Sequence, residues 1–295
     1  MRMLLDTASL WYRAYFGMPD SLRSPSGMPV HLIRGVLDMT SRLMTNYQPT
    51  ELVFCLDSDW RPSWRVELIP SYKEHRVETG EVEELVEESM SEQIPILLEI
   101  LAAFGFAITG AANYEADDVI ATLCVDDTIV VTGDRDLFQL VDDKLMIRVA
   151  YLAKGVSSHD LVDESYIQNK YGIPGRRYGL FALLRGDASD GLPGVKGIGE
   201  KSAAILVNKC ESLSDLIKVS RDGDADIKPA IIAKLSSGVE YLERAFPVVS
   251  SARNVPLPKL DCKIPKESDL EHILTMKKEF GLGASVDRLI AALGK

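Results

Sequence analysis

Cysteine and histidine are scarce in this sequence, and neither occurs in the spacing of a metal site. The 295 residues include four cysteines and four histidines. No cysteines are paired as C-x-x-C and no H-E-x-x-H pattern occurs, which excludes a zinc site of these kinds and a disulfide scaffold. Any metal bound by this chain is therefore expected to be a hard cation held by oxygen atoms.

Long apolar runs are missing as well. No stretch approaches the roughly 20 apolar residues that a helix needs to cross a bilayer. The N-terminus lacks the charged lead, the long apolar segment and the small-residue cleavage site of a secretion signal. We therefore expect an intracellular protein with no membrane partner, and the absence of a heptad pattern favours a monomer.

Positive charge is in deficit. The sequence has 33 Lys and Arg against 44 Asp and Glu, a net charge of −11, which taken alone argues against a nucleic-acid partner. The distribution changes this expectation, because basic residues outnumber acidic ones between Lys170 and Lys209. The stretch from Glu78 to Glu92 is the opposite extreme, with no basic residue. We interpret it as a solvated helix face; the alternative is a barrier that repels duplex DNA and admits a single strand.

Short apolar runs alternate with amphipathic, helix-length segments over the first 175 residues. Such runs are typical of buried strands in a mostly parallel sheet, and the alternation predicts a doubly wound α/β fold with helices on both faces. The expected strands are residues 3–5, 52–56, 106–109, 129–132 and 145–150, and the expected helices are residues 30–47 and 94–104.

The strand signal stops near residue 175, and short helices with glycine-rich turns follow. We expect a main α/β domain over residues 1–175, with a polar insertion at about 59–92. A helical module would span residues 176–250, with helices at 202–208 and 239–246. A tail over residues 251–295 would pack back on the main domain through helices at 270–280 and 286–293.

Carboxylates follow the ends of the expected strands. In an open α/β sheet the functional crevice lies beyond the carboxyl ends of the strands, so side chains at these positions should converge there. Taken singly, each acid is more often a helix cap or a turn residue. The full set comprises Asp6, Asp57, Glu115, Asp117, Asp118, Asp134, Asp136, Asp187 and Asp190.

So many carboxylates in one crevice would repel one another unless cations intervened. Two Mg²⁺ or Mn²⁺ ions about 4 Å apart would resolve the conflict, and such a pair hydrolyses phosphodiesters. The pattern therefore predicts a metal-dependent phosphodiesterase. Asp118 and Asp187 are the members that we would most readily assign to supporting the ligands rather than to binding the metal.

A glycine-rich turn stands in the basic module, from Leu192 to Ser202. Its glycines would let backbone N–H groups approach a phosphate, and Lys196 and Lys201 supply positive charge. A P-loop needs lysine where Glu200 stands, and a dinucleotide fingerprint needs a preceding strand, which is missing. A helix-hairpin-helix turn that grips the DNA backbone without reading bases fits better.

In this combination, the sequence resembles the 5′ nuclease (flap endonuclease) superfamily. Similar proteins are the 5′-nuclease domain of bacterial DNA polymerase I and the free-standing bacteriophage 5′-3′ exonucleases. The matching stretches cover about the first 250 residues in the family's order. They are Ser9-Leu10-Trp11-Tyr12-Arg13-Ala14-Tyr15, Asp57, Tyr72-Lys73-Glu74-His75-Arg76, Glu115-Ala116-Asp117-Asp118, Thr132-Gly133-Asp134-Arg135-Asp136, and Gly186-Asp187 through Lys201.

The resemblance implies a PIN-like α/β domain, a helical arch over the active site formed by the insertion, and a helix-three-turn-helix module. It also implies two Mg²⁺ or Mn²⁺ ions and a K⁺ ion near the backbone carbonyls of Val195 and Ile198. One divalent ion would be held by Asp57, Glu115 and Asp117 with Asp6 nearby. The other would be held by Asp134, Asp136 and Asp190.

The same resemblance implies roles for several basic and aromatic residues. Lys73, Arg76 and Arg13 would hold the scissile phosphate and the 5′ strand. Tyr72 would stack on an unpaired base or pack on its own helix, while Arg61, Trp64 and Arg65 would be solvated arch surface. The duplex backbone would be held by Gly194, Lys196, Gly197, Gly199 and Lys201. The sequence departs from the family at Gly191, where asparagine is usual.

The implied function is that of a structure-selective 5′-3′ exonuclease and flap endonuclease. It would cleave branched or 5′-flap DNA near the junction, without sequence preference, in the cytoplasm of a bacterial host cell and with replication proteins in trans. Two alternatives stay open: a DNA-junction binding protein that has lost catalysis, and a PIN-type ribonuclease, which has no need of the duplex-gripping turn.

Overall fold

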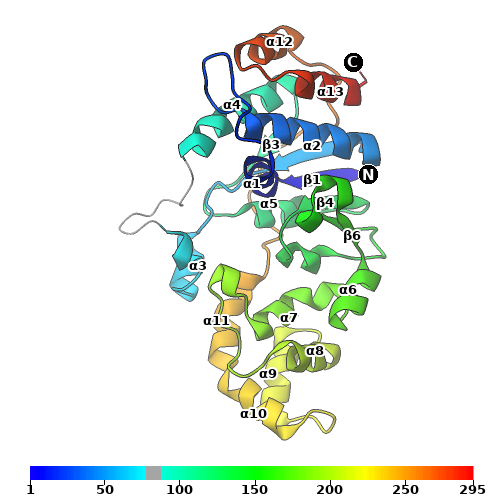
Figure 1. Cartoon of the computed structure of the whole chain (residues 1–295). Coiled ribbons are helices and arrows are strands. Elements are labelled where there is room, and N and C mark those ends of the chain that lie inside the picture. The colour runs from blue at the N-terminus through cyan, green and yellow to red at the C-terminus, as the bar shows by residue number, and fades with distance from the viewer. Residues whose placement is uncertain (78–87, 295) are drawn as a thin grey trace.

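The computed structural model describes residues 1–77 and 88–294, and within these residues the strands form one six-stranded sheet (Figure 1). The strand order is β3-β2-β1-β4-β5-β6. All neighbours are parallel except β6, which is antiparallel to β5. The strands are β1 (Arg2–Asp6), β2 (Glu51–Cys55), β3 (Ala107–Thr109), β4 (Thr128–Thr132), β5 (Arg148–Tyr151) and β6 (Asp160–Val162). The prediction of a mostly parallel sheet is confirmed.

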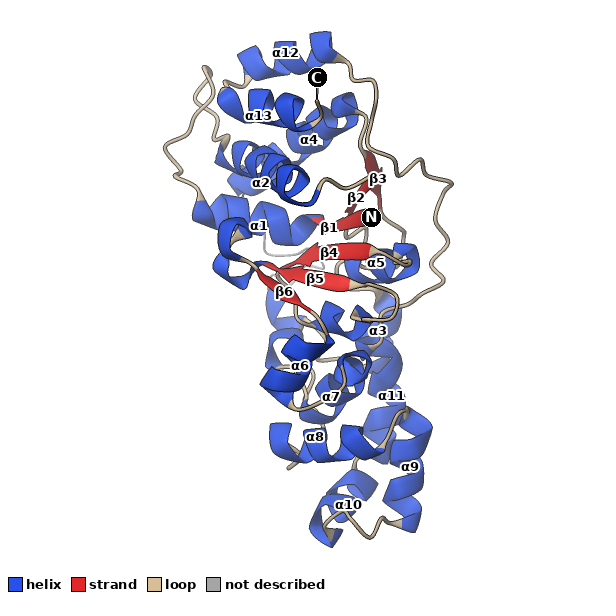
Figure 2. Cartoon of the chain, turned by 90° about the vertical axis from the view of Figure 1, so that its right-hand side faces the viewer, coloured by secondary structure: helices blue, strands red, loops and turns tan. Residues whose placement is uncertain are grey.

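Alternate side chains of each strand enter two separate cores, one on each face of the sheet. In β1, Met3 and Leu5 contribute to one core and Leu4 to the other. Figure 2 shows the helices on both sides of the strands. The first core is covered by α1 (Thr7–Gly17), α2 (His31–Tyr47), α4 (Glu88–Phe104), α12 (Leu270–Glu279) and α13 (Ala284–Ala292). The second face carries α5 (Ala116–Leu123).

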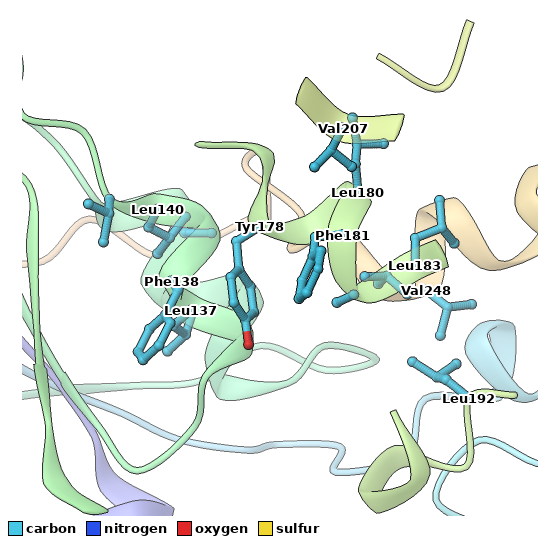
Figure 3. Close-up of a cluster of buried hydrophobic side chains, with 14 of the residues drawn as sticks. Leu137, Phe138, Leu140, Tyr178, Leu180, Phe181, Leu183, Leu192, Val207 and Val248 are labelled. Atoms are coloured by element: carbon cyan, nitrogen blue, oxygen red, sulfur yellow. The ribbon is translucent and has the colours of Figure 1, made fainter. Parts of the chain in front are cut away.

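The core on the second face continues without a break into the helical module (Figure 3). Phe138, which follows β4, lies edge-on to Tyr178 at 5.2 Å between ring centroids, and Tyr178 in turn contacts Phe181. Since all three rings are buried, the module is packed against the sheet rather than tethered to it. Its helices are α7 (Tyr178–Arg185), α8 (Glu200–Lys209), α9 (Leu213–Asp222), α10 (Pro229–Ser237) and α11 (Val239–Val249), while α6 (Glu164–Tyr171) precedes the module and contacts β6.

Two elements near the cleft were not predicted. Helix α1 begins directly after β1, where the Asp6 side chain accepts a hydrogen bond from the Ser9 N–H and caps the helix. Strand β6 has three residues, too few for an alternation signal. Strand β5 also begins later than expected, because Asp142 and Ile147 form an isolated bridge around a turn in which Met146 has φ 55°.

The insertion contributes two short elements within the described residues, α3 (Ser63–Leu68) and the 3₁₀ turn Glu74–Arg76. Most of the acidic run, from Glu78 to Glu87, lies outside the described residues. In the C-terminal tail α13 packs on α2, and the Arg288 guanidinium makes a two-pronged ion pair with Asp38. No helix within residues 1–77 and 88–294 is long and apolar enough to cross a bilayer.

Candidate active site

A cleft of about 810 Å³ lies at the carboxyl ends of β1, β2 and β4. Parallel strands bring Asp6 and Asp57 to the same edge, since Asp6 pairs with Cys55 in the sheet register and Asp57 follows two residues later. The cleft also collects the three predicted phosphate-binding cations. Its predicted site residues are Asp6, Arg13, Asp57, Lys73, Arg76, Glu115, Asp117, Asp134 and Asp187.

A second, smaller hollow of about 20 Å³ adjoins the cleft. Glu115 and Asp117 border both spaces, and Asp136 and Asp190 border the smaller one. Asp190 comes from the helical module, which supplies it through the turn after α7. The structure therefore brings together all the predicted acidic residues at these two spaces except Asp118.

Burial sets the protonation behaviour of Asp57. Its side chain accepts a hydrogen bond of 2.7 Å from the Ala116 N–H at the start of α5. Desolvation raises the pKa of Asp57 to about 7, the charge of Asp6 adds to the rise, and the Ala116 hydrogen bond opposes it. Half of the Asp57 side chains would thus carry a proton near neutral pH when no cation is bound.

The other acids show the same effect. Burial, with the charges of Asp134 and Asp6, raises the pKa of Asp117 well above its ordinary value. Burial, with the charges of Asp134 and Asp190, does the same to the pKa of Asp136. Desolvated carboxylates that repel one another are the electrostatic arrangement that a divalent cation stabilises.

Two basic side chains of the insertion provide counter-charges in this structure. The Lys73 ammonium pairs with Glu115 Oε2, and the Arg76 guanidinium lies 2.8 Å from Asp190 Oδ1. Burial opposes the charge on Lys73, but Tyr72 and Glu115 outweigh it and raise the pKa of the amine. In the part of the chain that the structure describes, no three His, Cys, Asp or Glu side chains are arranged to hold a metal ion as they stand. Lys73 and Arg76 thus occupy one oxygen each of Glu115 and Asp190.

Asp118 differs from the other predicted ligands, because both of its oxygens already have protein partners. Arg65 donates to Oδ2 at 2.9 Å and to Oδ1 at 2.8 Å. The Ala252 N–H donates to Oδ1 at 2.7 Å, and the Glu115 N–H to Oδ2 at 3.2 Å. Asp118 is fully buried and borders neither space. Its geometry is that of a structural acceptor.

Asp187 has protein partners, as Asp118 does, and also lines the cleft. Its Oδ1 accepts from the Ser189 N–H at 2.9 Å, and its Oδ2 lies 3.3 Å from the Arg185 guanidinium. Its position fits a residue that shapes the turn carrying Asp190.

Two residues of the insertion, Tyr72 and Arg65, are buried. Tyr72 is 3% exposed and its hydroxyl donates to Glu115 Oε1 at 2.8 Å. A ring so buried has no face for an unpaired base, so stacking on DNA does not fit this arrangement. Arg65 is likewise 3% exposed, and its expected place on a solvated surface is wrong. A buried arginine needs buried acids, and the run from Glu115 to Asp118 was the signal for it.

The glycine-rich turn joins α7 to α8 and presents its polar groups to solvent. Lys196, Gly197, Gly199 and Lys201 are exposed, while Gly194 is buried and its N–H donates to the Tyr241 hydroxyl. The side chains of Val195 and Ile198 are buried and anchor the turn in the module. The Lys234 ammonium donates to the Gly197 carbonyl at 2.9 Å. The turn thus carries two exposed lysines and does not line the cleft.

Gly191 allows the insertion to contact the turn that carries Asp190. It has φ 69°, and a Cβ atom there would lie 1.9 Å from the Ser71 carbonyl oxygen. The Ser71 hydroxyl donates to the Gly191 carbonyl, and the Lys73 N–H to the Asp190 carbonyl. Because of this close approach, the asparagine that the resemblance led us to expect does not fit at position 191.

Gly191→Asn is expected to lower the free energy of unfolding by about 1–3 kcal/mol, because residues 71–73 must move away from the added side chain. Gly172→Asn is the matched control, since Gly172 has φ 70° and an added Cβ would meet no atom within 4 Å. Urea denaturation of both variants measures the difference. Equal losses for the two would show that φ, not the contact with Ser71, is the cause.

Comparison with known proteins identifies the family. The model of the N-terminal resolvase-like domain of 5′-3′ exonucleases matches residues 1–172, and that of their C-terminal SAM fold matches residues 173–271. The chain belongs to the 5′-3′ exonuclease family. A 5′-3′ exonuclease of Streptomyces coelicolor is 47% identical over 299 residues, which cover 99% of this chain and 99% of the relative.

Two other similar proteins are a longer polymerase and a solved nuclease structure. DNA polymerase I of Mycobacterium bovis is 32% identical over 99% of this chain, which corresponds to 32% of the polymerase. A solved structure of the bacteriophage T5 flap endonuclease, in a pseudo-enzyme-product complex with DNA and metal ions, has a TM-score of 0.61 at 17% identity and covers 99% of each chain. The nuclease fold therefore extends over the whole chain.

Proposed function

We propose that this protein is a structure-selective 5′ nuclease that hydrolyses DNA phosphodiesters near junctions between a 5′ single strand and a duplex. The observation that carries the proposal is the cleft itself. Carboxylates from five segments, of which Asp6 and Glu115 are buried, line it together with the cations Arg13, Lys73 and Arg76. The identity of the relatives as 5′-3′ exonucleases supports the same reaction.

The donor set fits two divalent ions. All the candidate ligands are carboxylate oxygens, which Mg²⁺ and Mn²⁺ prefer, and their raised pKa values mark a site that favours added positive charge. Asp57, Glu115 and Asp117, with Asp6 nearby, would hold one ion, and Asp134, Asp136 and Asp190 the other. When bound, the ions supply the charge that activates a water and stabilises the leaving oxygen.

The chain's own cations position the substrate. Lys73 and Arg76 neutralise Glu115 and Asp190 in this structure. Once those carboxylates have other partners, both cations are free to hold the scissile phosphate. Arg13 lines the same cleft, and its buried Nε has no hydrogen-bond partner among the described residues, so an anion would satisfy it.

Duplex binding is assigned to the glycine-rich turn. Exposed Lys196 and Lys201, with the backbone N–H groups of Gly197 and Gly199, would contact phosphates without reading the base sequence. The predicted role of Gly194 does not fit, because its buried N–H already donates to the Tyr241 hydroxyl. Affinity should therefore fall with salt. The carbonyls of Val195 and Ile198 remain the candidate K⁺ ligands. Because the module that grips DNA also supplies Asp190, duplex binding and completion of the metal site would be linked.

A cleavage assay on labelled substrates tests the proposal. We expect a 5′-labelled DNA flap to be cut near the junction in Mg²⁺ and to stay intact in EDTA. A DNA flap that is bound but not cut in Mg²⁺ would leave a junction-binding protein without catalysis. Preferential cleavage of a matched RNA flap would instead indicate a PIN-type ribonuclease.

The raised carboxyl pKa values predict how pH affects stability. Asp57 has an ordinary pKa of 3.8 and a value of about 7 in the folded protein, so the folded state binds its proton more tightly. The stabilisation is complete below the unfolded value and is lost as the pH rises through the folded one. We expect the Tm in EDTA to fall between roughly pH 4 and pH 8, and Mg²⁺ to raise Tm more at the upper end, since metals bind deprotonated ligands.

Thermal melting with and without Mg²⁺ across this interval measures both effects. Asp57→Asn is the control, because removing the titrating group should flatten the fall in Tm. A Tm in EDTA that rises over the same pH range would contradict the assigned carboxyl behaviour.

A further inference from the structure

Arg65 occupies a position between the insertion and the carboxylates. It lies on α3, and its guanidinium forms a two-pronged ion pair with Asp118 while Nη1 also lies 3.0 Å from Glu115 Oε1. The guanidinium is also stacked 4.7 Å from the centroid of the Trp64 ring. These contacts leave the group one orientation, which a flexible ammonium could not reproduce.

Asp118 connects three parts of the chain that are distant in sequence. It accepts from Arg65 of the insertion, from the Glu115 N–H at the start of α5, and from the Ala252 N–H of the segment that leaves the helical module. Thr122, one turn further along α5, contacts the same segment through the Ala252 carbonyl and the Val255 N–H. The start of α5 is therefore fixed from both sides.

The two oxygens of Glu115 have different kinds of partner. Oε1 accepts from the Tyr72 hydroxyl at 2.8 Å and contacts Arg65, both of which are buried. Oε2 pairs with Lys73, which lines the cleft. One oxygen is thus held by the protein interior, whereas the other faces the cleft and has a partner that can be exchanged.

We propose that Arg65, acting with Asp118, is a positioning residue that holds Glu115 so that Oε2 is presented to the cleft for a divalent cation. The inference rests on the proposed function in one respect, the role of Glu115 as a metal ligand. Arg65 touches neither substrate nor metal in this account. The charge of Arg65 is balanced by the buried carboxylates of Asp118 and Glu115. Arg65 thus holds Glu115 through Oε1 and leaves Oε2 to Lys73 or to a metal ion.

The physical basis is orientation of a ligand by a neighbour that does not itself bind the metal. Such partners typically change metal affinity by about 10- to 100-fold when they are replaced. Lysine at position 65 keeps the charge but provides no planar fork, so it can hold Asp118 or Glu115 but not both. Burial favours the neutral form of Arg65, but Glu115 and Asp118 outweigh it and raise its pKa, so the guanidinium stays charged.

Titration calorimetry of Mn²⁺ into the DNA-free full chain tests the inference directly. We expect Arg65→Lys and Asp118→Asn each to weaken Mn²⁺ binding by about 10- to 100-fold. In cleavage assays the half-saturating Mg²⁺ concentration should rise by a similar factor, with flap-DNA affinity in EDTA unchanged. The double variant should lose little more than either single variant, because both changes disable the same unit.

Two controls separate positioning from general destabilisation. Glu67→Gln alters an exposed residue of the same helix, and Arg288→Lys disrupts another two-pronged arginine pair, neither member of which lines the cleft. Both should bind Mn²⁺ like the unaltered protein. If Arg65→Lys binds Mn²⁺ as tightly as the unaltered chain, or if its loss is matched by Arg288→Lys at equal loss of Tm, the inference is overturned.

Failure of the proposed function gives a different result. An unaltered protein that binds Mn²⁺ but does not cut flap DNA would refute the nuclease proposal, while the effect of Arg65→Lys on Mn²⁺ binding would still decide the role of Arg65. An unaltered protein that cuts the flap, together with an Arg65→Lys variant of unchanged Mn²⁺ affinity, would refute the positioning role alone.

Discussion

Asp134→Asn is expected to reduce flap cleavage by about 10³-fold or more, because several kcal/mol of metal-derived stabilisation of the transition state would be lost. Asparagine keeps the acceptor for the Asp136 N–H, which lies 2.8 Å from Asp134 Oδ1. It removes one of the charges that, in addition to burial, raise the pKa values of Asp117 and Asp136. The Tm in EDTA should therefore hold or rise while activity is lost.

Single-turnover cleavage, duplex binding in EDTA and thermal melting of the same preparation measure the three quantities. Asp142→Asn is the matched control, since Asp142 also accepts a hydrogen bond from the N–H two residues later but follows no strand end at the cleft. It should leave cleavage unchanged. Loss of duplex binding together with cleavage in Asp134→Asn would show that Asp134 has been assigned the wrong role.

Lys73→Ala is expected to lower the cleavage rate by about 100-fold, a typical effect of removing one charged contact to the reacting group. The affinity for the metal should rise or stay constant, because Lys73 competes with a cation for Glu115 Oε2. This split distinguishes the proposed exchange of partners from a purely structural ion pair, whose removal would weaken the site as a whole.

Rapid-quench kinetics at saturating Mg²⁺, combined with Mn²⁺ calorimetry, measure both parts of the Lys73 prediction. Lys154→Ala is the control, because Lys154 pairs with Asp160 at an exposed position. An unchanged cleavage rate would remove Lys73 from phosphate binding. Weaker Mn²⁺ binding in Lys73→Ala would mean that the lysine supports Glu115 and does not compete for it.

The convergence of carboxylates was predictable from the sequence because it follows from strand ends. Asp6, Asp57 and Asp134 each follow a short apolar run, and parallel strands place such positions at one edge. The sheet and the helical module were also predictable, because local patterns of apolar residues indicate strands and helices. Neither prediction required knowledge of which distant segments touch.

Features that depend on contacts between distant segments could not be predicted. Arg65 was predicted on the surface, but α3 packs it against Asp118. For Tyr72 the sequence left stacking and packing open, and the hydrogen bond from its hydroxyl to Glu115 fits packing. Gly191 looked like the loss of a side chain, whereas the close approach of Ser71 makes glycine the residue that fits. In each case the decisive neighbour lies more than 40 residues away in the sequence.

Anomalous diffraction from crystals soaked in Mn²⁺ tests the central claim most directly, because it locates the ions without relying on activity. We predict one ion between Asp57, Glu115 and Asp117, a second between Asp134, Asp136 and Asp190, and Lys73 displaced from Glu115. Mn²⁺ bound elsewhere on the protein, with these carboxylates still paired to Lys73 and Arg76, would contradict this prediction.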